Sequence, residues 1–167
     1  MTTVLAIDPG TTESAWVLID ADTRRPREFG KTINLDLLDL IDWRLGESSV
    51  AAIEMVASYG MAVGSDVFET CVWVGRFTEA IRRYRFDRAA PGYVKRHAVK
   101  VHHCHSAKAN DSNIRQALVD RFAPGQPNHG KGTKAAPGWF HGFHTDVWQA
   151  YALAVYAADV LDPKDDQ

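Results

Sequence analysis

The chain has 167 residues, of which 46% are hydrophobic and 24% charged, and this composition predicts one folded domain with a sizeable core. No apolar run is long enough to cross a membrane, and the first residues lack the features of a secretory signal. Cys71 and Cys104 have no CxxC spacing. We therefore expect a cytoplasmic protein with reduced thiols, although a single Cys71–Cys104 disulfide stays open on the sequence alone.

The net charge of -2 hides an uneven distribution. Between Arg82 and Lys108 there are eight lysines and arginines and one acid, Asp87, whereas the tail at about residues 160–167 is acidic. A basic stretch of this kind favours either a phosphate-binding surface or a solvated helix face followed by a charged loop.

Three strands are predicted at the start of the chain. They are apolar runs separated by short polar segments, at residues 3–8, 14–20 and 28–33. The first run ends at Asp8, directly before Pro9 and Gly10, which interrupt the strand. Connections this short favour antiparallel neighbours.

The rest of the chain alternates between helices and strands. Helices are predicted at residues 34–45, 65–85, 111–122 and 145–161, and strands at 50–54 and 98–102. Asn34 or Asp36 is expected to cap the first of these helices and Asp111 the third, and Ser65 or Asp66 is expected to start the second. Loops follow at residues 55–64 and 123–142. Alternation implies parallel strands with crossovers, so we expect an α/β fold whose mixed five-stranded sheet has helices on both faces.

Three acids stand where such a sheet would bring them together. Asp8 ends the first strand, Glu54 ends the fourth, and Asp146 opens the last helix. Taken singly, each has an ordinary interpretation as a turn former, a solvated acid or a helix cap. Carboxylates that converge repel one another unless a cation lies between them. Mg²⁺ prefers hard oxygen ligands and Mn²⁺ could replace it, so the pattern predicts a metal site suited to phosphodiester cleavage.

Three motifs carry a resemblance to a known family. The sequence AIDPG at residues 6–10 resembles the opening motif of the RuvC-type Holliday junction resolvases. AIE at 52–54 resembles their second motif, and DVWQAYALA at 146–154 their final helix. The resemblance covers residues 3 to about 159. It implies an RNase H-like fold and a homodimer that acts in the cytoplasm of a bacterial or phage-infected cell. It also implies an enzyme that needs Mg²⁺ or Mn²⁺ and cleaves branched DNA, four-way junctions above all. Asp8, Glu54 and Asp146 carry over as catalytic metal ligands.

The chain also departs from the family pattern. Gln149 stands where the family commonly has a second acid, one turn into the last helix, and its oxygen could still bind a metal or an outer-shell water. His144 lies close by and could act as a ligand or base, or simply begin the helix. The family tends to place an aromatic wedge soon after the second-motif glutamate. Ala57 occupies about that position here, so Tyr59 or Met61 could take the role.

DNA contacts and subunit contacts are assigned to the basic segment and the long helix at residues 65–85. Lys100 and Lys108 flank the predicted last strand and are expected to bind phosphates, and Arg82 and Arg83 could reach DNA arms. The long helix has apolar residues on more than one side. Trp73 is therefore expected either at a dimer interface or beneath the 123–142 loop.

Other interpretations stay open. Residues 7–14 also resemble the first phosphate motif of the actin, Hsp70 and sugar kinase superfamily, although the chain is short for that architecture and shows no second glycine-rich loop. Gln149 leaves room for a non-catalytic DNA-binding protein of the same fold. The run His102-His103-Cys104-His105 invites a zinc site, but no second ligand pair has a recognised spacing, so these side chains favour a basic surface.

Overall fold

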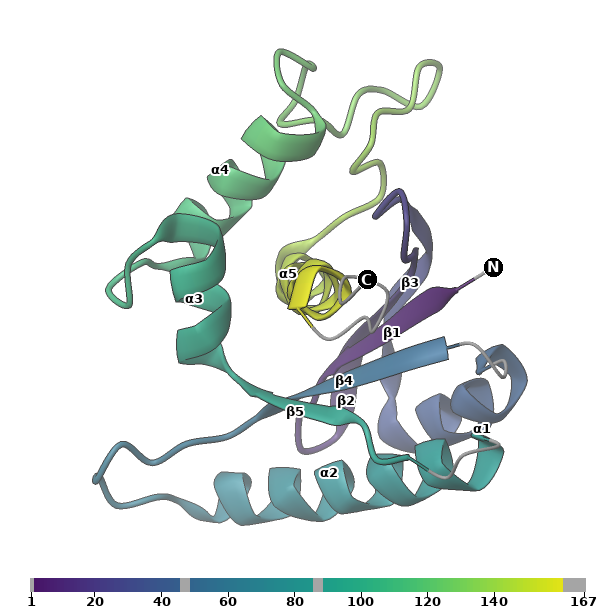
Figure 1. Ribbon diagram of the computed structural model, residues 1–167, viewed down its shortest axis with the longest axis vertical. Helices are drawn as coiled ribbons and strands as arrows, with labels where there is room; N and C mark the ends of the chain where they lie inside the picture. The colour runs from purple at the N-terminus through teal and green to yellow at the C-terminus, as the bar shows by residue number, and fades with distance from the viewer. Residues whose placement is uncertain (1, 46–48, 86–88, 161–167) are drawn as a thin grey trace.

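The computed structural model describes residues 2–45, 49–85 and 89–160, and Figure 1 shows how its elements are arranged. The strands are Thr3–Asp8 (β1), Glu13–Asp20 (β2), Pro26–Ile33 (β3), Ser49–Met55 (β4) and Gly92–Lys95 (β5). The helices are Asn34–Arg44 (α1), Ser65–Tyr84 (α2), Arg96–Cys104 (α3), Asp111–Phe122 (α4) and Thr145–Val160 (α5).

The strands form a mixed five-stranded sheet in the order β3-β2-β1-β4-β5. The first three strands are antiparallel neighbours, whereas β4 runs parallel to β1 and β5 runs parallel to β4. Helices α1 and α2 cover one face, and α5 lies across the other with α3 and α4 beside it (Figure 1). The predicted α/β sheet with helices on both faces is confirmed.

Strand alternation divides the core between the two faces. Leu5, Ile7 and Ile53 pack with α1 and α2 on one face. Ala6 and Ala52 belong to the cluster around α5 on the other. Eleven of the residues of α5 are buried, and five of these are alanines. Small side chains allow the helix axis to approach the sheet closely, so the start of α5 is held against the ends of β1 and β4.

The predicted strand at residues 98–102 is wrong, because this segment lies within α3. The fifth strand is the shorter segment β5, which pairs in parallel with β4. Pro91 directly precedes β5, Gly92 is its first residue, and four residues are too few to show a clear alternation. Val99 is the buried residue of α3, and the polar residues around it are typical of a helix with one face in the core.

Two of the expected helix caps are also wrong. Asn110 caps α4, since its side chain accepts a hydrogen bond from the backbone N–H of Asn113 and the Asn113 side chain accepts one from that of Asn110. Neither Asn34 nor Asp36 caps α1, which begins after Ile33 without a side-chain cap. Helix α2 begins at Ser65, as predicted, and also has no side-chain cap. Asp111 is therefore not required as a cap.

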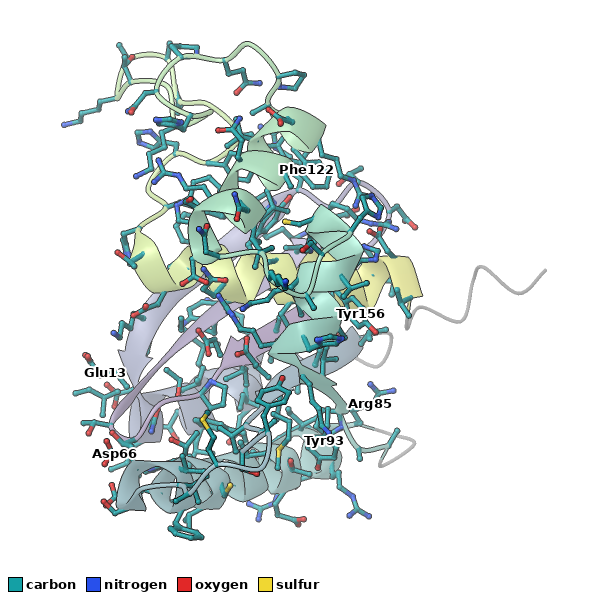
Figure 2. The ribbon with its side chains drawn as sticks, turned by 90° about the vertical axis from the view of Figure 1, so that its left-hand side faces the viewer. Glu13, Asp66, Arg85, Tyr93, Phe122 and Tyr156 are labelled. Carbon is teal, nitrogen blue, oxygen red and sulfur yellow. The ribbon has the colours of Figure 1, made fainter. Side chains whose placement is uncertain are left out.

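The long loop after α4 packs against the α5 face of the sheet. Figure 2 labels Phe122 at the end of α4, where its ring stacks on that of Trp139 with centroids 5.4 Å apart. Phe140 and Phe143 of the loop are buried in the same cluster. Trp73 packs in the cluster on the opposite face, so the interpretation that it lies beneath this loop is wrong.

The structure also bears on the predictions for the two cysteines, for membrane-spanning segments and for the acidic tail. Cys71 and Cys104 are both free, so they form no disulfide. Among the described helices, none has the length and apolar character needed to cross a membrane. The acidic tail beyond residue 160, like Asp87 and Arg88 in the basic segment, lies outside the described residues.

Candidate active site

The sheet register places Asp8 and Glu54 side by side on the α5 face. Asp8 pairs with Ala15 of β2, and Ala15 pairs with Lys31 of β3. Glu54 follows Ile53, which is the parallel partner of Ile7. Residues opposite one another in a sheet point to the same face, so Lys31, Asp8 and Glu54 form one row across its end.

Helix α5 brings Asp146 to the same row. The ammonium of Lys31 donates a hydrogen bond of 2.5 Å to Asp146 Oδ2. Burial and the charge of Glu54 raise the pKa of Asp8 to about 7, with a smaller contribution from Asp146 and opposition from Arg96. The structure therefore brings the three predicted carboxylates close enough to act on one another.

Arg96 connects this row to a further acid. It begins α3 directly after β5, and its guanidinium donates to Glu54 Oε2 at 3.3 Å and to Asp111 Oδ1. Burial raises the pKa of Glu54, and the positive charge of Arg96 opposes that rise. Sequence reasoning missed Lys31, Arg96 and Asp111 as parts of the site. The alternation of β3 could have placed Lys31, but the other two depend on the displaced fifth strand.

A buried ring of hydrogen bonds fixes the turn that follows Asp8. The Gly10 N–H donates to Ser14 Oγ at 3.1 Å, the Ser14 hydroxyl donates to Asn34 Oδ1 at 2.6 Å, and Asn34 Nδ2 donates to the Gly10 carbonyl at 2.9 Å. A Cβ on Gly10 would lie 2.3 Å from the Glu13 carbonyl oxygen, so a larger residue would push the turn open. Asn34 thus holds the turn that follows Asp8.

A cavity of about 340 Å³ opens beside the row, between the starts of α4 and α5. Its lining residues are Asp111, Ser112, Arg115, Lys131, His144, Thr145, Trp148 and Gln149. His144 and Gln149, both singled out in the sequence, line this cavity together. Within the described residues, Gln149 Oε1 and Arg115 Nε are buried and have no hydrogen-bond partner.

The predicted DNA-binding residues occupy four places. Lys100 lies one turn after Arg96 on α3, and its charge lowers the pKa of Glu54. Lys108 is exposed in the connection to α4, and Arg82 and Arg83 are exposed at the end of α2. Tyr59 is exposed in the loop after β4, at a φ of 50°. Only Lys100 stands near the carboxylates.

The histidine run has structural partners. His102 Nε2 donates to Asp159 at 2.8 Å, and His103 Nε2 donates to the Ala152 carbonyl at 2.8 Å. Burial lowers the pKa of His103 to about 4, so its imidazole is neutral near neutral pH. These side chains lie on α3 rather than at a strand end, and they tie that helix to α5.

The residues present fit a divalent cation in charge and donor type. In the described parts of the chain, no three acidic, histidine or cysteine side chains are arranged to hold a metal ion as they stand. Lys31 and Arg96 instead neutralise Asp146 and Glu54. The convergence of buried carboxylates and the unpartnered Gln149 oxygen nevertheless match the hard oxygen donors that Mg²⁺ prefers.

The sheet is an antiparallel meander extended by two parallel strands, and the acids at the ends of β1 and β4 face the last helix. This arrangement defines the RNase H-like fold. Within that class, the structure resembles the RuvC protein of Thermus thermophilus. The TM-score is 0.61 at 16% identity over 93% of both chains. A structure of T. thermophilus RuvC in complex with a Holliday junction substrate gives 0.61 at 14% identity over 97% of this chain and 96% of that one.

These similarities establish a RuvC-type fold. No family model and no curated protein matches the sequence.

Proposed function

We propose that this chain is a divalent-metal-dependent endonuclease that cleaves branched DNA, with four-way junctions as its main substrate. The observation that carries the proposal is the row of Asp8 and Glu54 on one face of a RuvC-type sheet, with Asp146 brought to it by α5. One of the similar structures is a complex with a Holliday junction substrate, which supports the choice of DNA.

Asp8, Glu54 and Asp146 are the proposed ligands of Mg²⁺, with Mn²⁺ as a substitute. When bound, a pair of such ions would activate a water molecule and stabilise the oxygen that leaves the phosphorus. Lys31 and Arg96 hold two of these carboxylates in the absence of metal, and on release they are positioned to bind phosphate oxygens. His144 is the proposed base or additional ligand at the cavity edge.

The proposed path of the DNA begins at Lys100, next to Glu54, and continues over Lys108. Arg82 and Arg83 lie at the far end of α2 and are assigned to the arms of the substrate. Tyr59 and Met61 are large, exposed side chains in the loop that directly follows the Glu54 strand. A left-handed backbone at Tyr59 holds the loop in a defined turn, which suits a wedge between base pairs.

The direct test is cleavage of a labelled four-way junction, a fork and a linear duplex in Mg²⁺. We expect Asp8→Asn, Glu54→Gln and Asp146→Asn each to lower the cleavage rate by about a hundredfold or more, because each removes charge from the metal site. Junction binding should persist, since affinity comes mainly from basic side chains on phosphates. Asp39→Asn, an exposed acid on α1, is the matched control and should cleave normally.

Three outcomes would contradict the proposal in whole or in part. If the Asp8→Asn variant cleaved at the wild-type rate, Asp8 would not belong to the catalytic set. If the wild type bound junctions but cleaved none in Mg²⁺ or Mn²⁺, the chain would be a non-catalytic DNA-binding protein of this fold. Equal cutting of linear duplex would keep the nuclease but remove the preference for branches.

A further inference from the structure

Position 149 carries an amide, but an acid faces it across the cavity. Asp111 begins α4 and Gln149 lies one turn into α5, and both line the cavity of about 340 Å³ beside the catalytic row. The Asp111 side chain is 68% exposed and is not the residue that caps its helix. The cavity therefore contains an exposed carboxylate that does not cap its helix and whose ion-pair partner is Arg96.

Gln149 points to a ligand for this cavity. The residue is only 7% exposed, and its Oε1 has no hydrogen-bond partner among the described residues. A buried amide oxygen without a partner is destabilising and is uncommon in folded proteins. A carboxamide oxygen is a normal ligand for hard divalent cations, so a cation in the cavity would satisfy it.

Arg96 links the cavity-lining Asp111 to the catalytic row. Its guanidinium donates to Glu54 through one nitrogen and to Asp111 through the other, so one side chain spans the two acids. The same residue thus marks Asp111 as a neighbour of the metal-binding carboxylates. A guanidinium that bridges two carboxylates occupies the kind of position that a divalent ion can take.

We propose that Asp111 and the Oε1 of Gln149 complete the donor set of one catalytic cation, with Asp111 providing the carboxylate that position 149 lacks. The inference rests on the proposed function, because it assigns ligands to the same metal centre. Asp111 comes from α4, so the complete site draws ligands from β1, β4, α4 and α5.

The cavity suits a cation with its phosphate better than a free anion. Asp111 and the Gln149 oxygen are acceptors and would repel a phosphate that arrived alone. Arg115 and Lys131 also line the cavity, and Arg115 Nε is a buried donor without a partner in the described chain. A metal-bound phosphate would meet the acceptors through the ion and these two cationic side chains through its oxygens.

Mn²⁺ binding to the full chain, without DNA, tests the assignment independently of cleavage. We expect the wild type to bind Mn²⁺ at two sites and Asp111→Asn to weaken one of them by about tenfold or more. Gln149→Ala should weaken the same site. Asp120→Asn, another exposed acid on α4, is the control and should bind as the wild type does. Circular dichroism checks that each variant is folded.

A cysteine at position 111 distinguishes direct coordination from a general charge effect. In a background that carries Cys71→Ser and Cys104→Ser, Asp111→Cys should bind Cd²⁺ with a thiolate-to-cadmium charge-transfer band in the near ultraviolet. Asp120→Cys should give no such band.

Normal Mn²⁺ binding by Asp111→Asn, or the absence of the band in Asp111→Cys, would overturn the inference and leave the proposed function standing. A wild type that binds no Mn²⁺ would overturn both.

Discussion

At the scale of single residues, the buried carboxyl of Asp8 makes folding stability depend on pH. Its carboxyl is largely buried in a row with Glu54, and burial is the main reason that its pKa rises to about 7. Between the ordinary value of 3.8 and about 7, the folded protein binds more protons at Asp8 than the unfolded chain does. Folding stability therefore falls as pH rises through this range.

The neutral variant Asp8→Asn should be more stable than the wild type at alkaline pH. We expect a gain of about 2 kcal/mol at about pH 8 in the presence of a chelator, because the amide removes a buried charge. The gain should shrink toward about pH 5, where the wild-type carboxyl is protonated. Urea unfolding at several pH values measures it.

Divalent metal provides the control for that comparison. Mn²⁺ should stabilise the wild type more than Asp8→Asn, since the charged Asp8 carboxylate is its proposed ligand in the folded state. A gain in stability that was the same at every pH would show that packing, rather than charge, distinguishes the two side chains.

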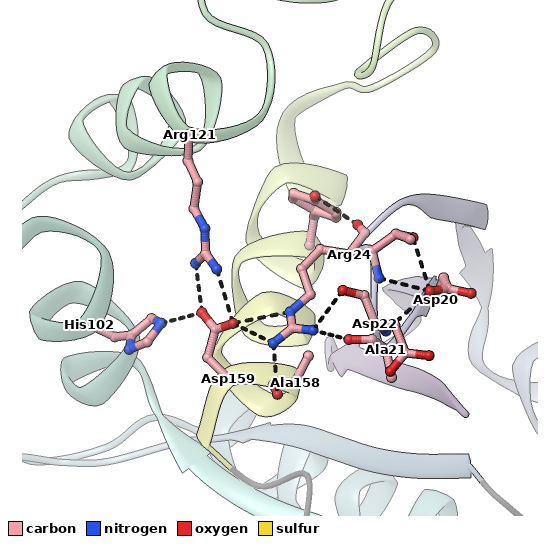
Figure 3. A network of polar contacts seen from close by, with 10 residues as sticks. Asp20, Ala21, Asp22, Arg24, His102, Arg121, Ala158 and Asp159 are labelled. Carbon is pink, nitrogen blue, oxygen red and sulfur yellow. Dashed lines mark hydrogen bonds and ion pairs between the residues drawn. The ribbon is translucent and has the colours of Figure 1, made fainter. Parts of the chain in front are cut away.

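At the scale of elements, α5 positions the site at one end and is anchored at the other. Asp159, near the end of α5, accepts hydrogen bonds from Arg24 in the β2–β3 connection, His102 on α3 and Arg121 on α4 (Figure 3). Burial by itself raises the pKa of Asp159, but these hydrogen bonds hold that pKa well below its usual value. One carboxylate thus joins three neighbouring segments to the helix that carries Asp146.

Replacing this anchor should loosen α5. We expect Asp159→Asn to lower the free energy of unfolding by about 2 kcal/mol near neutral pH, less than for a fully buried ion pair because Arg121 is partly exposed. A lowered pKa contributes stability above about pH 4, and the contribution is lost as pH falls through the folded-state value. The difference between variant and wild type should therefore narrow at about pH 3.

Asp39→Asn on α1 is the matched control and should unfold as the wild type does at every pH. A difference between Asp159→Asn and wild type that stayed constant down to about pH 3 would contradict the charge-based account of the anchor.

At the scale of the whole molecule, α2 presents an apolar surface away from the sheet. Phe68 is 63% exposed and Val72, one turn later, is 62% exposed, whereas Trp73 is partly buried against Phe77. The predicted interface helix therefore turns Phe68 and Val72 outward rather than Trp73. A four-way junction has two strands to cut at symmetry-related positions, so we propose that this surface joins two copies of the chain.

The variant Phe68→Glu should dissociate such a dimer, because it places a charge in an apolar contact. Sedimentation should show a dimeric wild type and a monomeric variant. Leu35→Glu on α1 replaces a comparably exposed apolar residue and should remain dimeric. A monomeric wild type that cuts both strands of a junction would refute the dimer, and dissociation by Leu35→Glu alone would move the interface to α1.

Local sequence patterns predict most of the sheet and place three acids at the ends of its strands and at the start of the last helix. β1, β2 and β4 are apolar runs of core side chains, so their pattern is local and readable along the chain. Asp8 and Glu54 stand at the ends of such runs, and the helix of α5 is evident from its alanines. These features depend on neighbours in the sequence, which is why they could be predicted.

The surroundings of these acids in the candidate site depend instead on how the helices pack on the sheet. β5 is an edge strand of four residues whose partner is β4, and without that pairing the segment that follows reads as a strand instead of α3. The correct start of α3 places Arg96 between Glu54 and Asp111, and the start of α4 brings Asp111 opposite Gln149. Contacts between residues so distant along the chain follow from packing of the helices on the sheet, because no local pattern encodes which helix end faces which strand.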